Sequence, residues 1–254
     1  MTFINDVAWL KKEKYDYVES EAFLLDVKRL ENGEPLAYLI GNVPFLNTII
    51  YLDSHPLIPR PETEYWTELA IKEIQNIIKS NNAPAKILDL CAGSGCVGVA
   101  VAKNLPLTAV DFIELDEGHL ATIRKNCKEN NLKPERTRIM SGDLNDLKQT
   151  VPDTKYDFIL SNPPYIDKEL VRTELSVTNH EPALALYGGK DGLEFIKAII
   201  EQAPSHLLAG GQLWLEHEPE QVEAIANLSA QHGFKPLTHP DQFGVPRFSQ
   251  LMLQ

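Results

Sequence analysis

The 254-residue sequence lacks the features of several protein classes. It has three cysteines, Cys91, Cys96 and Cys127, which form no Cys-x-x-Cys pair and suit a reducing compartment. No apolar run approaches the roughly 20 residues that a membrane-spanning helix needs. Near the N-terminus, Asp6 stands where a signal peptide would carry basic residues. We therefore expect a cytoplasmic protein without disulfides and without membrane contact.

Basic residues are the minority charge. The sequence has 24 Lys and Arg against 36 Asp and Glu, a formal net charge of -12, and such a surface repels phosphate backbones. Two dense basic clusters are better explained as solvated faces than as nucleic-acid footprints: Lys11, Lys12 and Lys14, and Lys133, Arg136 and Arg138. The seven histidines are scattered, so no metal site is expected. We expect a monomer that acts on a protein or small molecule rather than on free nucleic acid.

The N-terminal part of the sequence predicts a small appendage. Over residues 1–40 we expect a short helical head, in which Ser20 caps a helix that ends at Gly33. A second short helix near Val7–Leu10 would pack against the apolar face of the first. That apolar face would consist of Phe23, Leu24, Val27 and Leu30. Residues 41–59 predict a hairpin-like connector, because their apolar pattern is broken by turn-forming residues.

From residue 60 to residue 254 the sequence alternates between helical and strand patterns. Strand-like runs occupy residues 86–90, 108–114, 137–140, 156–161 and 211–216, and two more short strands fall within 234–253. Helical patterns begin at Pro61 and cover 97–103, 118–130 and 193–208, the last bent or broken by Pro204. We therefore expect an α/β fold with a seven-stranded, mostly parallel, doubly wound, Rossmann-like sheet. Ligands of such sheets bind at the carboxyl ends of the strands.

A glycine-rich loop follows the first strand of this domain. Gly93, Gly95 and Gly98 have the spacing of a nucleotide-binding turn between a strand and a helix. Glu114 closes the next strand, where a carboxylate accepts hydrogen bonds from ribose hydroxyls. A turn that serves only helix–strand packing is the alternative. The combination of strand, helix and spaced acid favours an adenosine-containing cofactor.

Two further carboxylates bear on the identity of the cofactor. Asp89 lies beside the loop, where its charge disfavours a pyrophosphate and favours S-adenosylmethionine, which carries a sulfonium and an ammonium group. Asp89 can instead hold the backbone N–H groups of the loop, and this alternative stays open. Asp143 follows the third strand and can accept from an adenine amino group or simply form a turn.

The most specific signal follows the fourth strand, where the sequence reads Asn162-Pro163-Pro164-Tyr165. The Pro163 carbonyl lies outside any strand ladder, and the Asn162 side chain offers a neutral oxygen acceptor. Two acceptors that converge on one planar –NH₂ group would fix its orientation, with Tyr165 as a ring against which the group lies. Orientation must supply most of the rate, because an amide nitrogen is a poor nucleophile. A proline-rich turn without chemistry is the alternative.

At this motif the sequence resembles class I S-adenosylmethionine-dependent methyltransferases, and more closely the release-factor glutamine methyltransferase family. The resemblance also runs through residues 34–41 and 57–64, and the motif around Gly93 and Glu181–Leu186 continues it. It implies transfer of a methyl group to the glutamine amide nitrogen (N5) in the Gly-Gly-Gln motif of class-1 peptide chain release factors. The helical head would then help to dock the release factor, and residues 60–254 would form the methyltransferase domain.

The resemblance also implies roles for individual residues. Asn162 and Pro163 would hold the glutamine amide, Tyr165 would lie beside it, and Asn162 would also face the cofactor. The implied substrate cleft is completed by Pro164 and by a segment containing Arg60, Glu62 and Thr63. Gly93, Gly95 and Glu114 would hold the amino acid and ribose ends of the cofactor. The expected cofactor residues are therefore Asp89, Gly93, Gly95, Glu114, Asp143 and Asn162.

Two departures from the family pattern stand out. The stretch before residue 34 is shorter than the usual helical head, which bears on docking, and Ala92 replaces a common threonine in the glycine loop. Three other functions compete with the protein methyltransferase. An adenine-N6 methyltransferase of DNA or RNA shares the Asn-Pro-Pro-Tyr motif, an NAD(P)-dependent oxidoreductase shares the glycine spacing, and a non-enzymatic protein could keep the fold as a cofactor binder.

Overall fold

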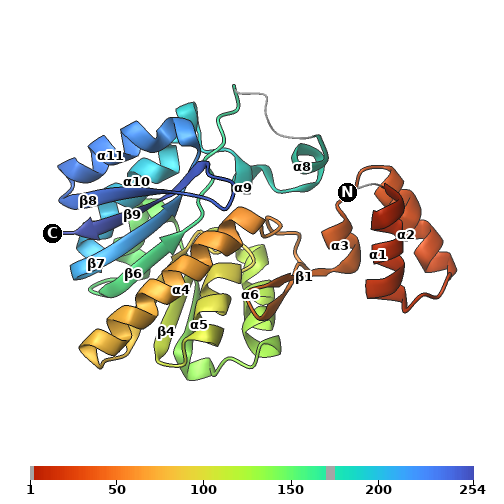
Figure 1. The fold of residues 1–254 in the computed structure, drawn as a ribbon, viewed down its shortest axis with the longest axis horizontal. Helices are drawn as coiled ribbons and strands as arrows, with labels where there is room; N and C mark the ends of the chain where they lie inside the picture. Colours follow the sequence, from red (N-terminus) through yellow and green to blue (C-terminus); the bar gives the residue numbers. More distant parts are fainter. Residues whose placement is uncertain (1–2, 170–174) are drawn as a thin grey trace.

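The main body of the protein is a sheet covered by helices on both faces (Figure 1). The computed structural model describes residues 3–169 and 175–254. Seven strands run in the order β5-β4-β3-β6-β7-β9-β8. They are β3 (Ala85–Leu90), β4 (Thr108–Glu114), β5 (Thr137–Ser141), β6 (Tyr156–Ser161), β7 (Leu207–Glu216), β8 (Phe234–Pro240) and β9 (Pro246–Leu253). The five strands from β3 to β7 pair in parallel, while β9 pairs antiparallel with β7 and β8. The predicted mostly parallel, doubly wound sheet is confirmed.

The two faces of the sheet bury separate hydrophobic cores. On one face lie α4 (Pro61–Asn81), α5 (Cys96–Asn104) and α6 (Glu117–Glu129). On the other lie α7 (Leu147–Thr150), α10 (Glu194–His206) and α11 (Val222–Gln231). In β3, Ile87 belongs to the first core and its neighbour Leu88 to the second, and both are fully buried. A central parallel strand is apolar on both faces, which is why its sequence reads as a continuous hydrophobic run.

The boundary between α10 and β7 differs from the prediction. The helix was expected to reach Leu208, but α10 ends at His206 and β7 begins at Leu207. Pro204 lies in the last turn of α10, where its missing N–H group removes one helical hydrogen bond. Leu207 then takes an extended backbone conformation. The helix α11 was not predicted at all, nor were the short helices α3 (Leu36–Ile40), α8 (Leu175–His180) and α9 (Ala183–Leu186).

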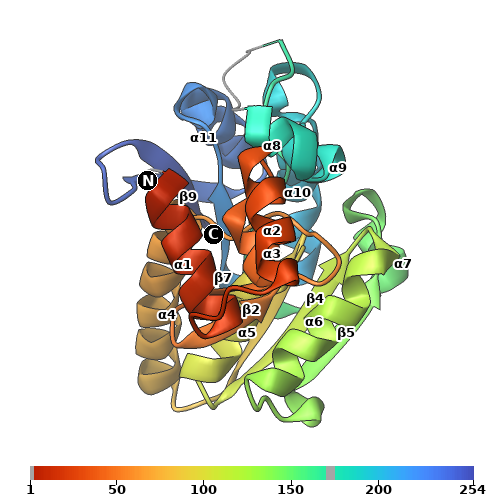
Figure 2. The ribbon, with the colours of Figure 1, turned by 90° about the vertical axis from the view of Figure 1, so that its right-hand side faces the viewer.

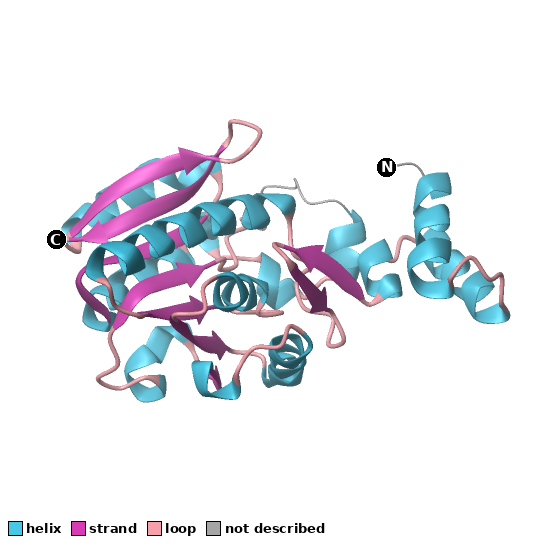
Figure 3. Ribbon diagram, turned by 60° about the horizontal axis from the view of Figure 1, so that its bottom comes forward, coloured by secondary structure: helices cyan, strands magenta, loops and turns pink. Residues whose placement is uncertain are grey.

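The head consists of α1 (Phe3–Tyr15), α2 (Glu21–Glu31) and α3, and it stands off one end of the body (Figures 1 and 3). The Phe23 backbone N–H donates to Ser20 Oγ at 3.1 Å, so the predicted cap is confirmed. Leu24 was expected on the buried face of α2, but its side chain is 54% exposed. The buried side chains follow the spacing of Phe23, Val27 and Leu30, and Leu24 lies about 100° further round the helix.

A hairpin joins the head to the body. Its strands β1 (Asn42–Phe45) and β2 (Thr48–Tyr51) are antiparallel. Two asparagines, one in α6 and one at its C-cap, hold β2 as a neighbouring strand would, because each accepts from a backbone N–H and donates to a backbone C=O. Asn126 does so at Tyr51, over 2.7 and 3.0 Å, and Asn130 does so at Ile49, over 3.1 and 2.8 Å. The hairpin is therefore fixed relative to the sheet.

The hairpin and the head helices lie near the carboxyl edge of the sheet. The parallel strands end on the side of the hairpin, and from that side the head helices lie in front of the sheet (Figures 2 and 3). The segment between β2 and α4 runs along the same edge, as do α8 and α9. Among the described residues, no helix combines the length and apolar character needed to cross a bilayer.

Candidate active site

Two adjoining cavities open at the carboxyl edge of the parallel strands. The glycine-loop cavity, of about 320 Å³, is lined by residues that follow β3, β4 and β5. The proline-loop cavity, of about 280 Å³, is lined by residues that follow β6 and β7. Asn162 lines both cavities, as do Leu57 and Ala185. A group on Asn162 can therefore reach ligands in either space.

The carboxylate of Glu114 anchors the glycine loop. Its Oε2 accepts the Gly93 backbone N–H at 2.7 Å and its Oε1 accepts the Asp116 backbone N–H at 2.9 Å. Both Glu114 and Gly93 line the glycine-loop cavity. An ionised carboxylate has about four lone-pair directions, so Glu114 keeps acceptor capacity for the hydroxyls of a ligand.

Asp89 binds the first turn of α5 and also lines the glycine-loop cavity. Its Oδ2 accepts the Gly98 backbone N–H at 2.8 Å, and its side chain lines the glycine-loop cavity. Burial raises the pKa of Asp89 to about 8, with a further contribution from nearby Glu114. Glycine is required at 98 because a Cβ there would lie 2.4 Å from Phe112 Cε1 and 2.9 Å from Asp89 Oδ2. The structure thus shows Asp89 holding the backbone, as one of the two sequence interpretations had it.

The remaining predicted cofactor residues are placed differently from one another. Asp143 lines the glycine-loop cavity, and its Oδ1 accepts from Asn145 at the backbone N (2.8 Å) and at Nδ2 (2.9 Å). It therefore forms a turn while facing the cavity. Gly95 lines neither cavity and is instead the N-cap of α5, where its Cβ position lies 3.0 Å from the Ile123 side chain.

The charge of the glycine-loop cavity indicates the kind of ligand that fits it. Four acidic side chains line the cavity, and no Lys or Arg is among the described residues around it. Glu114, Asp116 and Asp143 supply negative charge, whereas the raised pKa of Asp89 keeps that group largely protonated at neutral pH. Such a wall repels a pyrophosphate and suits a cationic cofactor with hydroxyl groups. Cys91 and Cys96 also line it, and burial raises the pKa of both thiols, so neither acts as a nucleophile at neutral pH.

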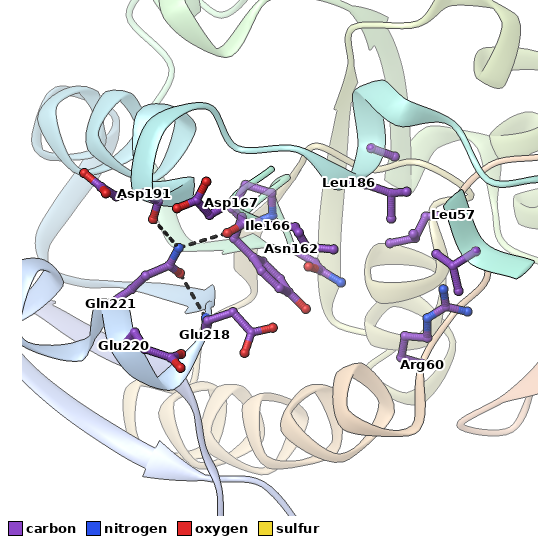
Figure 4. Close-up of a pocket in the computed structure, with 14 residues that line it drawn as sticks. Leu57, Arg60, Asn162, Ile166, Asp167, Leu186, Asp191, Glu218, Glu220 and Gln221 are labelled. Carbon is purple, nitrogen blue, oxygen red and sulfur yellow. Dashed lines mark hydrogen bonds between the residues drawn. The ribbon is translucent and has the colours of Figure 1, made fainter. Parts of the chain in front are cut away.

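The proline-loop cavity presents the amide of Asn162. Figure 4 shows this side chain between Asp167 and Glu218 on one side and Leu57 and Arg60 on the other. Asn162 Nδ2 donates to Thr63 Oγ1 at 3.1 Å. The nitrogen end of the amide therefore faces Thr63, and the carbonyl oxygen lies at the other end of the amide group.

The other members of the motif surround Asn162. Pro163 and Tyr165 line the proline-loop cavity, whereas Pro164 lines the glycine-loop cavity. The Tyr165 hydroxyl donates to Glu216 Oε1 at 2.8 Å. Burial and the carboxylate of Glu216 raise the pKa of Tyr165 well above its usual value, so the hydroxyl stays protonated.

Gln221 and Gly192, which come later in the sequence, contact the loop after β6 and hold it in place. Gln221 Nε2 donates to the carbonyl oxygens of Tyr165 (2.9 Å) and Asp191 (3.0 Å), as the dashed lines in Figure 4 show. The backbone of Gly192 lies against the loop so closely that a Cβ there would sit 1.9 Å from the Tyr165 carbonyl oxygen. Position 192 therefore has no room for a side chain.

The start of α4 contributes two of its three predicted site residues. Arg60 lines the proline-loop cavity and donates from its Nη2 to Glu181 Oε1 at 2.5 Å. Thr63 lines the glycine-loop cavity. Glu62, in the first turn of α4, lines neither cavity.

Three residues that position the site were not predicted from the sequence. Glu216 lies at the carboxyl end of β7 and accepts from Thr63, Trp66 and Tyr165. Glu181 accepts the Ile58 backbone N–H at 3.0 Å as well as the Arg60 guanidinium. The third residue, Gln221, has no signal in the sequence. Glu216 could have been found, because it ends a predicted strand at the edge where ligands bind.

A protein family and individual proteins of known name are similar in sequence to this chain. Residues 67–180 match the family described as "Methyltransferase small domain". The chain is 36% identical over 210 residues to the release factor glutamine methyltransferase of Thermodesulfovibrio yellowstonii, covering 82% of this chain and 72% of that protein. It is 34% identical over 246 residues to the Bordetella pertussis protein of the same name, covering 95% and 87%.

A solved structure supports the fold. The ribosomal protein L11 methylase of Lactobacillus delbrueckii subsp. bulgaricus matches with a TM-score of 0.55 at 17% identity, covering 80% of this chain and 82% of that one.

Within the described part of the chain, no group of three or more His, Cys, Asp or Glu residues has the geometry of a metal site.

Proposed function

Because the chain belongs to the release factor glutamine methyltransferase family, we propose that it methylates a glutamine side chain of a release factor. The acceptor would be the amide nitrogen (N5) of the glutamine in the Gly-Gly-Gln motif of class-1 peptide chain release factors. One observation carries the proposal: Asn162 lies on the wall shared by the two cavities. A neutral acceptor at that point can hold an amide in one cavity beside a cofactor in the other.

S-adenosylmethionine is the cofactor that the glycine-loop cavity suits. When bound, it supplies a methyl group on a positively charged sulfur. Glu114 would accept from its ribose hydroxyls, Asp143 from its adenine amino group, and Gly93 would let the backbone approach. The carboxylates of Glu114, Asp116 and Asp143 favour its positive charge over the negative charge of a dinucleotide.

The residues of the proline loop would orient the substrate. The Asn162 side-chain oxygen and the Pro163 carbonyl would each accept one hydrogen of the glutamine –NH₂ group, with the Tyr165 ring alongside. Both hydrogens are then held, and the face of the nitrogen turns toward the shared wall. Because the amide lone pair is delocalised, this orientation and the surrounding charge would supply most of the rate. Arg60 would complete the cleft beside Leu57.

We propose that the N-terminal head docks the release factor. We assign residues 1–40 to a docking head, 41–59 to a connector and 60–254 to the methyltransferase domain, although residues 1 and 2 lie outside the described part. Large apolar side chains are exposed on α1 and α2, among them Ile4, Trp9 and Leu25, at 78%, 53% and 61%. Such a surface suits a protein partner better than free nucleic acid. We also propose that the protein is a cytoplasmic monomer, which is consistent with a release factor as its substrate.

A labelling assay tests this proposal. The protein is incubated with methyl-labelled S-adenosylmethionine and, in parallel, with a class-1 release factor, duplex DNA and RNA. Label in the Gly-Gly-Gln peptide of the release factor, located by mass spectrometry on the glutamine, is the expected result. Label in adenine would support the nucleic-acid methyltransferase instead, and no label with any substrate would contradict both.

A further inference from the structure

Glu216 is a buried carboxylate that touches the site without lining either cavity. Its side chain ends β7, and the residue is 1% exposed. Oε2 accepts the Thr63 hydroxyl at 2.7 Å and the Trp66 indole N–H at 2.6 Å, while Oε1 accepts the Tyr165 hydroxyl at 2.8 Å. Thr63 lines the glycine-loop cavity and Tyr165 the proline-loop cavity. One carboxylate therefore holds a wall residue of each cavity.

The chemistry of these partners fixes the direction of every hydrogen bond. Burial raises the pKa of Glu216, whereas the three donors around it and the charge of Arg247 favour its ionised form. In that form the carboxylate only accepts, an indole N–H only donates, and a threonine hydroxyl has a single hydrogen. Because Thr63 gives that hydrogen to Glu216, its oxygen can only accept from Asn162. The –NH₂ end of the Asn162 amide must face Thr63, so the carbonyl end faces away from it.

The direction matters because the two ends of an asparagine amide have nearly the same shape. A half-turn about the last side-chain bond would exchange oxygen and nitrogen with little change in packing. The substrate –NH₂ group would then meet a donor instead of an acceptor. Packing alone cannot prevent this exchange, but a partner that can only accept prevents it.

We propose that Glu216 is a positioning residue that acts through Thr63 to orient the Asn162 amide, with the Asn162 oxygen toward the substrate nitrogen. The inference rests on the proposed function, because a substrate –NH₂ group such as that of a glutamine amide requires an acceptor at that point. Trp66 strengthens the arrangement, since its N–H requires an acceptor at the same carboxylate oxygen that Thr63 uses.

The first test removes the hydroxyl between Glu216 and Asn162. Thr63→Val has the same shape but cannot accept from Asn162, and we expect kcat for the Gly-Gly-Gln peptide to fall by about 30-fold. The dissociation constant for S-adenosylmethionine should change by less than about threefold, because the isosteric side chain leaves the cavity wall in place. Thr63→Ser keeps the hydroxyl and should recover kcat to within about fivefold of wild type.

A second pair of variants tests the carboxylate itself. In Glu216→Gln, the Trp66 N–H selects the amide oxygen, so Thr63 still has an acceptor and kcat should stay within about fivefold. Glu216→Leu removes both oxygens, and kcat should fall by more than about 30-fold. If the leucine variant does not fold, the Thr63 variants decide the matter.

A double-mutant cycle separates positioning from a general structural effect. In an Asn162→Ala background, Thr63→Val should lower kcat by less than about threefold, because the group that it positions is gone. An unchanged 30-fold loss in that background would overturn the proposal. So would near-normal kcat in Thr63→Val itself.

A readout without turnover keeps this inference separable from the proposed function. In NMR spectra of protein labelled with ¹⁵N asparagine, the Asn162 –NH₂ signals are identified by their loss in Asn162→Ala. We expect them to exchange with solvent more slowly in wild type than in Thr63→Val. Equal exchange rates would overturn the inference whether or not the peptide is methylated, whereas slow exchange without methylation would contradict only the proposed function.

Discussion

The side-chain nitrogen of Asn162 lies 3.1 Å from the hydroxyl oxygen of Thr63, although 99 residues separate them in the sequence. Asn162 follows β6, and Thr63 lies in the first turn of α4. Their contact joins the proline loop to the first turn of α4. The site therefore depends on two motifs that the fold brings together, and variants of either motif should affect the same chemistry.

The most direct variant is Asn162→Ala. Loss of the acceptor should lower kcat/KM for the Gly-Gly-Gln peptide by at least about 30- to 150-fold, or ~2–3 kcal/mol, as loss of one transition-state hydrogen bond does. Calorimetry should show cofactor affinity within about threefold of wild type. Asn76→Ala, at an exposed position of α4, is the matched control and should keep full activity. Near-normal turnover of Asn162→Ala would contradict the amide clamp.

Glu114→Gln should weaken cofactor binding. The carboxylate accepts from two backbone N–H groups, and an amide can accept only through its oxygen, so its –NH₂ end would oppose one of these donors. We expect the dissociation constant for S-adenosylmethionine to rise by about 10- to 100-fold in calorimetry. Glu117→Gln removes the same charge at an exposed position outside both cavities and should bind normally. Equal affinities would show that Glu114 does not hold the cofactor.

Gly192→Ala should displace the proline loop. The added Cβ would lie 1.9 Å from the Tyr165 carbonyl oxygen, so the backbone of one segment must shift. We expect kcat/KM to fall by more than about tenfold, because small misplacements of catalytic groups are costly. Gly244→Ala has a comparable positive φ, +84° against +66°, but its Cβ meets no atom within 4 Å. Both variants should lose about 1–2 kcal/mol of stability from backbone strain, and only the first should lose activity.

Asp89 should make the stability of the cofactor-free protein depend on pH. Its folded-state pKa of about 8 lies above the unfolded value of ~3.9, so the folded protein binds more protons between these values. Its contribution to the free energy of unfolding is fully present below about pH 4 and falls as the pH rises toward 8. Asp89→Asn keeps an acceptor for the Gly98 N–H but does not titrate. The free energy of unfolding of the variant, relative to wild type, should therefore increase by at least about 1 kcal/mol from pH 6 to pH 9, and a constant difference would contradict this shift.

The sequence could predict the sheet because its strands are determined locally. Residues 156–161 form an apolar run, and β6 has the same bounds. The loops after these strands could be assigned for the same reason, since strand ends of a parallel sheet meet at one edge. The boundary at Leu207 could not be predicted, because a proline in the last turn of a helix leaves the choice of the next residue to tertiary contacts.

The contacts within the site were beyond sequence reasoning. Glu216 meets Thr63 across 153 residues, and no local pattern encodes a pairing at that separation. The sequence left two interpretations of Asp89 open, because the spacing of an acid beside a glycine loop fits a hydrogen bond to the backbone and a contact with a ligand equally well. The structure shows its bond to Gly98, which depends on how closely α5 approaches β3.

A crystal structure of the protein with S-adenosylhomocysteine and a Gly-Gly-Gln peptide tests the central claim most directly. We predict that the glutamine side-chain nitrogen lies in the proline-loop cavity, within about 2.7–3.2 Å of the Asn162 carbonyl oxygen, and that the –NH₂ group of Asn162 still donates to Thr63. A glutamine side chain bound away from Asn162, or an Asn162 amide that turns its nitrogen toward the substrate, would contradict it.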